Sequence, residues 1–215
     1  MTASNATTRG STVEQWAHGL AESTGSPGGG AAAGVMLAIA LGLTSMVAGY
    51  TAEPESDEDL AALRKRARSR LDTALRLADD DASASEAFGN AFALEPGDGR
   101  DDAVNMASLE AARTSAAIGD SAAEAIGDLE WLSEHGNPAV ISDTAVALGA
   151  LRAALIGART NVSFDLAALR SAGEPLDQIR ERHPALWVSV QRFSSAIARI
   201  DSLATAIDDR AAPTD

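Results

Sequence analysis

An aspartate and an asparagine occupy positions where side chains could move protons or hold a polar substrate. Asp143 follows Ser142 in the first turn of a predicted helix, where the helix dipole favours a carboxylate. This placement is typical of a capping residue; the alternative is a carboxylate that transfers protons or binds the N–H groups of a heterocycle. Asn161 lies eighteen residues further on the same helix face, about 27 Å from Asp143. Either the two residues have different roles, or a second subunit brings them together.

A glycine-rich segment offers a second kind of site. Residues 25–30 read Gly-Ser-Pro-Gly-Gly-Gly and lead into an uncharged stretch over residues 31–50. A helix that begins just after Gly28, Gly29 and Gly30 would direct unpaired backbone N–H groups at an anion or a carbonyl oxygen. The alternative for this segment taken alone is a flexible linker.

The composition narrows the function classes. The net charge of −14 argues against nucleic acid and against anionic membranes as partners. The chain has no cysteine and its three histidines lie in unrelated segments, so no metal site is expected. No P-loop, dinucleotide fingerprint or Ser-His-Asp arrangement occurs. The N-terminus does not resemble a signal peptide, which predicts a cytoplasmic protein.

The elements that would position these residues are all predicted to be helices, because alanine is abundant and no run alternates with period two. The expected fold class is all-α, an up-and-down bundle of about five to seven helices that assembles as a homodimer. Residues 1–10 are predicted to be a disordered tail, residues 11–210 one domain, and residues 211–215 a frayed tail. Helices are expected over residues 12–23, 31–52, 56–94, 101–134, 138–169, 176–181 and 184–209.

Two of these helices carry stripes of small residues at spacings of three and four, which predict close packing against another backbone. The first stripe is Gly34, Ala38, Gly42, Ser45 and Gly49; the second is Asp143, Ala147, Ala150, Ala154, Ala158 and Asn161. The uncharged helix is long enough to cross a membrane, but its many alanines and glycines favour a helix buried among others. The basic residues from Arg64 to Arg70 favour a solvated face, with a clamp for an anionic tail as the alternative.

Three blocks of sequence carry a resemblance to a known family. The first is residues 26–30 with Thr44-Ser45-Met46-Val47, and the second is Asp81 with Ala84, Ala91 and Leu94. The third is Gly136-Asn137-Pro138, Ser142-Asp143, Val146-Ala147, Gly157-Ala158, Asn161-Val162 and Leu166. Together they resemble the cyclodeaminase/cyclohydrolase family of folate enzymes. This family includes the C-terminal domain of formiminotransferase-cyclodeaminase and stand-alone methenyltetrahydrofolate cyclohydrolases.

The resemblance implies an all-helical dimer with a folate site near the subunit interface, and one of two reactions. A formimidoyltetrahydrofolate cyclodeaminase converts 5-formiminotetrahydrofolate to 5,10-methenyltetrahydrofolate and ammonia. A methenyltetrahydrofolate cyclohydrolase adds water to the methenyl carbon and gives 10-formyltetrahydrofolate. The tetrahydrofolate derivative is the substrate, and no further cofactor is implied.

The same resemblance assigns roles to particular residues. Asp143 is expected to do acid–base or electrostatic work, with Asp81 as the second carboxylate. The backbone of Gly28, Gly29 and Gly30 would reach the ligand, and three polar residues would hold or orient it: Asn137, Ser142 and Asn161.

Several positions depart from the family pattern, mostly by loss of positive charge. Val104 and Asn105 stand where basic residues are usual, Ser85 where an aromatic residue is usual, and Ala31 where a serine is usual. Since a folate with its glutamate tail is an anion, these losses leave a second interpretation open. It is a catalytically degenerate, repurposed helical dimer of the same fold with a binding or structural role. An unrelated helical interaction protein is the third.

Overall fold

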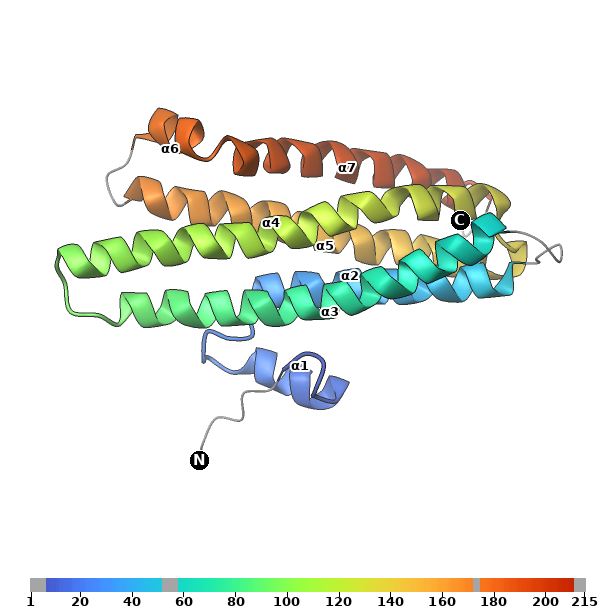
Figure 1. The fold of residues 1–215 in the computed structure, drawn as a ribbon. Helices are drawn as coiled ribbons and strands as arrows, with labels where there is room; N and C mark the ends of the chain where they lie inside the picture. The colour runs from blue at the N-terminus through green and yellow to red at the C-terminus, as the bar shows by residue number, and fades with distance from the viewer. Residues whose placement is uncertain (1–6, 52–57, 172–174, 211–215) are drawn as a thin grey trace, which may run out of the picture.

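The computed structural model describes residues 7–51, 58–171 and 175–210, and the regular elements in these ranges are all helices. They are α1 (Val13–Ala21), α2 (Gly29–Tyr50), α3 (Glu58–Phe92), α4 (Asp98–His135), a short 3-10 helix η1 (Pro138–Val140), α5 (Ile141–Ser171), α6 (Leu176–Arg182) and α7 (Pro184–Asp208). The long helices run side by side in alternating directions, as Figure 1 shows. The predicted all-α up-and-down bundle is confirmed.

The sequence explains where helices begin and which face they bury. Thr12 caps α1, because its hydroxyl accepts from the Gln15 N–H at 3.2 Å while the Gln15 side chain accepts from the Thr12 N–H. Asn137 caps the next helical segment, because its side chain accepts from the Ala139 N–H at 2.9 Å and Pro138 follows it. The first turn of this segment is η1, and α5 begins directly after it. Buried positions on α3 recur at helical spacing: Leu60, Leu63, Ala67, Ala74, Ala78, Asp81, Ala84 and Ala91.

The small residues of α2 and α5 allow the close packing that their spacing predicts. A Cβ atom added at Gly34 would lie 2.8 Å from the Ala78 Cβ of α3. One added at Gly157 would lie 2.9 Å from the Ala33 Cβ. Real Cβ atoms do not approach so closely, so these glycines set the separation of α2 from α3 and of α5 from α2.

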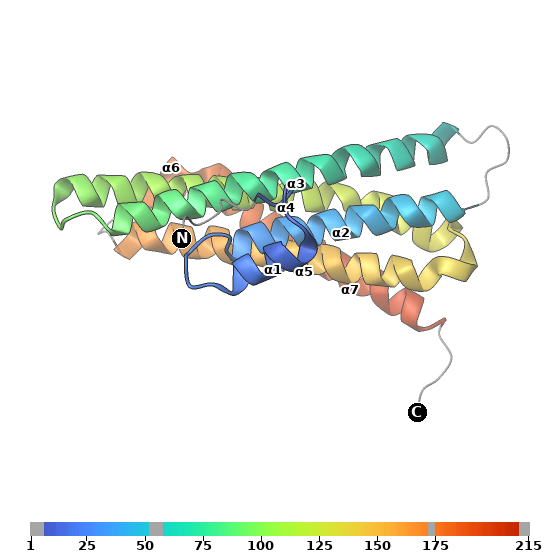
Figure 2. The same ribbon diagram turned by 90° about the horizontal axis from the view of Figure 1, so that it is seen from below.

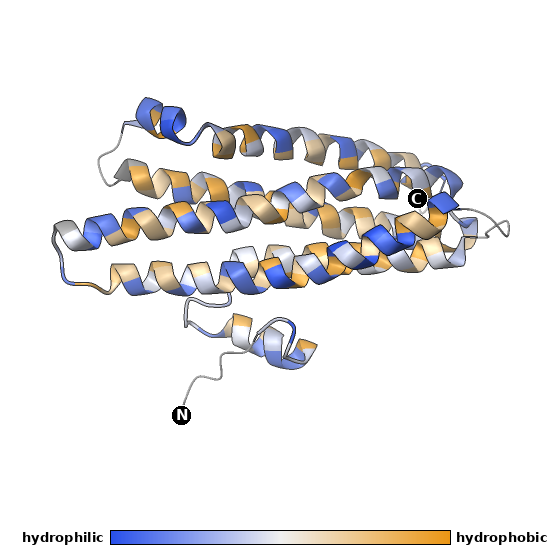
Figure 3. Ribbon diagram, in the orientation of Figure 1, coloured by the Kyte–Doolittle hydropathy of each residue, from blue (hydrophilic) through white to orange (hydrophobic). Residues whose placement is uncertain are grey.

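The main hydrophobic core lies where α2, α4, α5 and α7 meet, and its members include the fully buried Leu37, Leu148 and Phe193. Gly119 of α4 makes room for the Phe193 ring, because a Cβ there would lie closer than 3.0 Å to the ring. The hydropathy of the helices differs along the bundle. In Figure 3, α6 and the arginine-rich half of α3 are largely hydrophilic.

Two helical stretches, α2 and residues 138–169, are long and apolar enough to cross a membrane. In α2 the most apolar window is 56% buried inside the bundle, where the helix contacts α3, α4 and α5. That burial agrees with the expected core helix, since a helix buried in a bundle can be as long and as apolar as a membrane-spanning helix.

The N-terminal region differs from the expectation in one respect, and its first helix lies outside the core. Residues 7–10 form a turn against α3, in which the Thr8 N–H donates to Asp79 at 2.5 Å, so this part of the predicted tail is ordered. The other predicted tail residues, 1–6 and 211–215, lie outside the described ranges. Helix α1 buries no residue in the core, and Val13 is 86% exposed. The nine-residue helix is held through Trp16, whose indole N–H donates to the Thr8 hydroxyl at 3.2 Å.

Candidate active site

A cavity of about 300 Å³ opens at the start of α2, where α2, α3, α4 and α5 converge. Figure 2 shows α2 running between α3 and α5. The lining residues are Gly25, Gly28, Gly29, Gly30, Asp81, Ser85, Phe88, Gly89, Ala111, Ser115, Asn161 and Asp165. We call this space the glycine cavity. Among the described residues, no group of three or more His, Cys, Asp or Glu side chains is placed to hold a metal ion.

The glycine-rich segment forms one wall of this cavity. Gly25 has a φ of 84°, a conformation that favours glycine, and turns the chain toward α3. There the Ser26 hydroxyl donates to the Ala82 carbonyl at 2.8 Å. Gly28 is the N-cap of α2 and supplies no side-chain cap. A Cβ atom at Gly30 would lie closer than 3.0 Å to both carboxylate oxygens of Asp81, so glycine here lets that carboxylate reach the helix start.

Asp81 is therefore a fixed carboxylate at the positive end of α2. It is only 3% exposed. Its Oδ1 accepts from the Ser115 hydroxyl at 3.0 Å and from the Thr114 hydroxyl at 3.2 Å, and the Ala31 N–H and the Ser85 hydroxyl also donate to it. Burial raises the pKa of Asp81, while these four hydrogen bonds oppose the rise because they stabilise the ionised form.

Asp165 is the second carboxylate of the cavity and lies on α5, four residues after Asn161. Burial raises the pKa of Asp165 to about 7, and the nearby charge of Asp81 acts in the same direction. Asp81 ionises first, because its hydrogen bonds favour the charged form. The cavity thus combines a fixed anion with a carboxyl group that gains and loses a proton near neutral pH.

The structure separates the predicted site residues into two groups. Gly28, Gly29, Gly30, Asp81 and Asn161 come together in the glycine cavity. The others lie at the opposite end of α2, in the segment that contains Asn137, Ser142 and Asp143. The Asn137 side chain donates to the Tyr50 carbonyl at 2.7 Å, near the last turn of the 22-residue α2 and about 30 Å from its start. The catalytic and binding roles assigned to these residues stay predictions.

The cavity also has lining residues that the sequence did not predict, and three of them bear on its chemistry: Asp165, Ser115 and Phe88. Asp165 could have been identified from the sequence, because a spacing of four residues places it on the same helix face as Asn161. Ser115 had no comparable signal, since its relation to Asp81 depends on how α3 packs on α4. Phe88 lies one turn from Ser85, and its ring supplies an aromatic wall near the position where the family pattern has one.

A chain of ring contacts leads from the cavity to a cation. Phe88 and Phe92 have ring centroids 4.8 Å apart, and the Arg100 guanidinium lies 5.6 Å from the Phe92 centroid. Arg100 belongs to the first turn of α4 and stands near the positions where the family pattern is basic. It is placed to attract an anionic group that extends out of the cavity.

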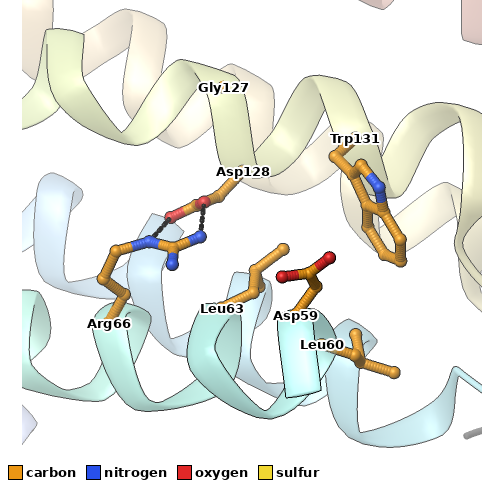
Figure 4. Close-up of a pocket in the computed structure, with 7 residues that line it drawn as sticks. All are labelled: Asp59, Leu60, Leu63, Arg66, Gly127, Asp128 and Trp131. Atoms are coloured by element: carbon orange, nitrogen blue, oxygen red, sulfur yellow. Dashed lines mark hydrogen bonds and ion pairs between the residues drawn. The ribbon is translucent and has the colours of Figure 1, made fainter. Parts of the chain in front are cut away.

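A second cavity of about 270 Å³ lies near the other end of the bundle, between the start of α3 and the end of α4. Figure 4 shows its residues, with Arg66 of α3 hydrogen-bonded to Asp128 of α4. Arg70 also donates to Asp128, at 2.9 Å. Asp128 is buried and joins two members of the basic block to α4, so Arg66 and Arg70 stabilise helix packing here. The predicted solvated face of this block is only partly correct.

These features define the class of protein: an antiparallel helical bundle with an open cavity, lined by two carboxylates, at the start of its most apolar helix. A family model described as formiminotransferase-cyclodeaminase matches residues 12–181. The chain therefore belongs to this family, and the resemblance of the three sequence blocks is confirmed.

Two similar proteins illustrate the relationship. The methenyltetrahydrofolate cyclohydrolase of Methylorubrum extorquens is 29% identical over 179 residues, which cover 79% of this chain and 86% of that protein. The crystal structure of formiminotetrahydrofolate cyclodeaminase from Thermotoga maritima matches with a TM-score of 0.74 at 23% identity, over 92% of this chain and 98% of that one. This structural match confirms the fold.

Proposed function

We propose that the glycine cavity binds a reduced folate and catalyses bond exchange at the one-carbon unit between N5 and N10. The observation that carries this proposal is the pair formed by Asp81 and Asp165 beside the glycine segment, in a chain of this family. Both family reactions need a group that moves a proton to a leaving nitrogen, and both pass through a cationic amidine carbon. A buried anion beside that carbon stabilises its positive charge.

Two reactions of the family fit this site. The curated relative with 29% identity is a methenyltetrahydrofolate cyclohydrolase, which supports water addition to the methenyl carbon. The description of the family supports the cyclodeaminase reaction, in which N10 displaces ammonia. The cavity serves either reaction, because each transfers a proton between an attacking atom and a nitrogen on the same carbon.

We also propose that the protein works as a homodimer, paired through the outward face of α2 and α5. Apolar side chains repeat at spacings of three and four on the exposed side of both helices. Ile39 is 52% exposed and Val146 is 59% exposed. The α2 stripe is Met36, Ile39, Leu43, Met46 and Tyr50; the α5 stripe is Val146, Gly149, Ala153 and Ile156. We call these residues the paired stripes.

A two-fold axis through the paired stripes would complete the site. Residue 152 is midway between Asp143 and Asn161 on α5, and it lies close to the centre of the α5 stripe. A two-fold axis perpendicular to α5 at this point therefore sets Asp143 of the partner subunit beside Asn161 and the glycine cavity. This arrangement keeps a role for Asp143 that a single chain does not permit.

The test of the reaction is absorbance at the methenyltetrahydrofolate chromophore. Purified protein is incubated with 5-formiminotetrahydrofolate in one sample and with 5,10-methenyltetrahydrofolate in another, and the rate without protein is subtracted. An enzyme-dependent rise in the first identifies a cyclodeaminase, and an enzyme-dependent fall in the second identifies a cyclohydrolase. No change in either sample, with the protein folded, would refute the proposal and favour the repurposed helical dimer.

The test of the shared site uses hybrid dimers. We expect Asp143→Asn and Asp165→Asn each to be nearly inactive alone. When the two variants are co-expressed, half of the dimers are hybrids with one intact site in two, so about a quarter of the wild-type activity returns. Full activity of Asp143→Asn would remove Asp143 from the site. Two inactive variants without recovery in the hybrids would refute the shared site, because one chain keeps Asp143 far from the glycine cavity.

A further inference from the structure

We propose that Asp165 is the residue that carries the proton in this reaction, while Asp81 remains a fixed anion that orients and stabilises the cationic carbon. The inference rests on the proposed function and assigns a catalytic role to a residue that the family resemblance did not single out. It stands on the different surroundings of the two carboxylates within one cavity.

Asp81 is poorly suited to proton transfer because its hydrogen-bonding capacity is occupied. Donors from three helices surround it: the Ala31 N–H on α2, the Ser85 hydroxyl on α3, and the Thr114 and Ser115 hydroxyls on α4. Protonation would oppose every one of these donors, since each stabilises the negative charge. With 3% of its surface exposed, Asp81 acts as a stationary charge.

Asp165 has the opposite surroundings. It is half-buried on α5 and lines the same cavity, so it can contact a molecule bound there. Of the titratable side chains, Asp81 on α3 and Asp165 on α5 line the described wall. Helix α2 supplies glycines there, and α4 supplies Ala111 and Ser115. The group that governs the charge of Asp165 is therefore Asp81, together with burial.

One carboxyl group is sufficient for the proton balance of either reaction. In ring closure the substrate starts as the amidinium, with two protons on the exocyclic nitrogen of the formimino group. N10 forms a bond to the formimino carbon and gives its own proton to Asp165. Asp165 then protonates the exocyclic nitrogen, which leaves as ammonia with the electron pair of its C–N bond. The N5 lone pair completes the methenyl cation, so one proton moves from N10 to the leaving nitrogen and Asp165 is unchanged.

Ring opening follows the same route. Water forms a bond to the methenyl carbon and gives a proton to Asp165, which returns it to N5. The C–N5 bond breaks as the remaining hydroxyl becomes the formyl carbonyl, and its proton is released to solvent. In both directions Asp165 must be ionised to begin, which requires a group that titrates near the working pH.

The experiment compares Asp165→Asn and Asp165→Glu with wild type and with the matched control Asp80→Asn. Asp80 is exposed on α3, next to Asp81 but outside the cavity wall, so it controls for the loss of one negative charge. The rate is measured between pH 5 and pH 9 with substrate in excess. In parallel, carbon NMR of protein labelled at aspartate carboxyls follows the titration of each group.

We expect the wild-type rate to rise with pH through a transition near 7, the Asp165→Asn rate to fall at least a hundredfold without that transition, and the Glu variant to recover part of the rate. One aspartate resonance should titrate near neutral pH and be missing in Asp165→Asn. Wild-type turnover that is unchanged in Asp165→Asn would overturn the inference and leave the proposed function standing. If the resonance of the Asp165 carboxyl titrated near pH 4, that result would also overturn the inference. Absence of wild-type turnover would instead refute the proposed function, and with it the catalytic role of Asp165.

Discussion

The contact between Gly30 and Asp81 gives the sharpest test of how the site is built, through the substitution Gly30→Ala. The new methyl group would lie closer than 3.0 Å to both carboxylate oxygens, and these oxygens are held by donors from three helices. Either the carboxylate moves and its hydrogen bonds to Thr114 and Ser115 weaken, or the start of α2 moves away from α3.

The expected cost follows from these contacts. Overpacking a tight contact costs about 1–3 kcal/mol. Weakening one hydrogen bond to a charged group costs about 1.5–3 kcal/mol. Since relaxation avoids part of each, we expect the free energy of unfolding to fall by about 3 kcal/mol. For a protein of this size that corresponds to a melting temperature lower by about 6–12 °C.

The assay is thermal or urea unfolding of wild type and variant at one protein concentration, because the proposed dimer would make stability concentration-dependent. Gly127→Ala is the matched control, since nothing lies within 4 Å of a Cβ there. Alanine in that helix interior should raise stability by up to about 1 kcal/mol. A Gly30→Ala variant as stable as wild type, with the Asp81 carboxyl resonance unmoved, would refute the account of the glycine segment.

Four further predictions follow from other contacts. Asp165 has a pKa raised from 3.8 to about 7, so the fold is stabilised by its protonated form and loses stability as pH rises from about 4 to 7. Asp165→Asn should therefore be more stable than wild type at pH 8, on the order of 2 kcal/mol after allowing for its partial exposure, and equal to it at pH 4 in calorimetry. Ile39→Glu or Val146→Glu should shift sedimentation from dimer to monomer, while Val188→Glu, at an equally exposed site on α7, should not. Asp128→Asn removes the partner of Arg66 and Arg70 and should lower the unfolding free energy by about 1–3 kcal/mol in urea titrations, with less effect at high salt. Arg100→Met should raise the KM for the folate at least tenfold with kcat little changed, and an unaltered KM would remove Arg100 from binding.

The helices could be predicted from the sequence because local residue patterns mark where a helix begins and which face it buries. Pro138 after Asn137 marks a helix start, and the small residues of α2 predict close packing that Gly34 indeed allows against Ala78. Helix α1 was less predictable. Its amphipathic spacing does not reveal whether the apolar face meets the core, and Val13 remains exposed.

The site was predicted only in part, for a geometrical reason. Types and spacing locate a residue on its own helix, and the family resemblance singled out Asp81, Asn161 and the glycines, which line one cavity in the structure. They do not determine which helix ends meet in space. Asp143 and Asn161 share a face of α5 but lie about 27 Å apart, so one chain places them at opposite ends of the bundle. Ser115 belongs to the site because α4 packs against α3, and its own sequence position does not indicate that contact.

The position of Asp81 at the start of α2 has a consequence for how this chain evolves. A carboxylate that holds the first turn of the central helix is retained by selection for folding alone, so its presence says little about activity. Asp165 differs in this respect, because its ionised form lowers the stability of the fold at neutral pH. In a relative without catalytic activity, we therefore expect Asp165 to be replaced and Asp81 to be kept, because only Asp81 stabilises the fold.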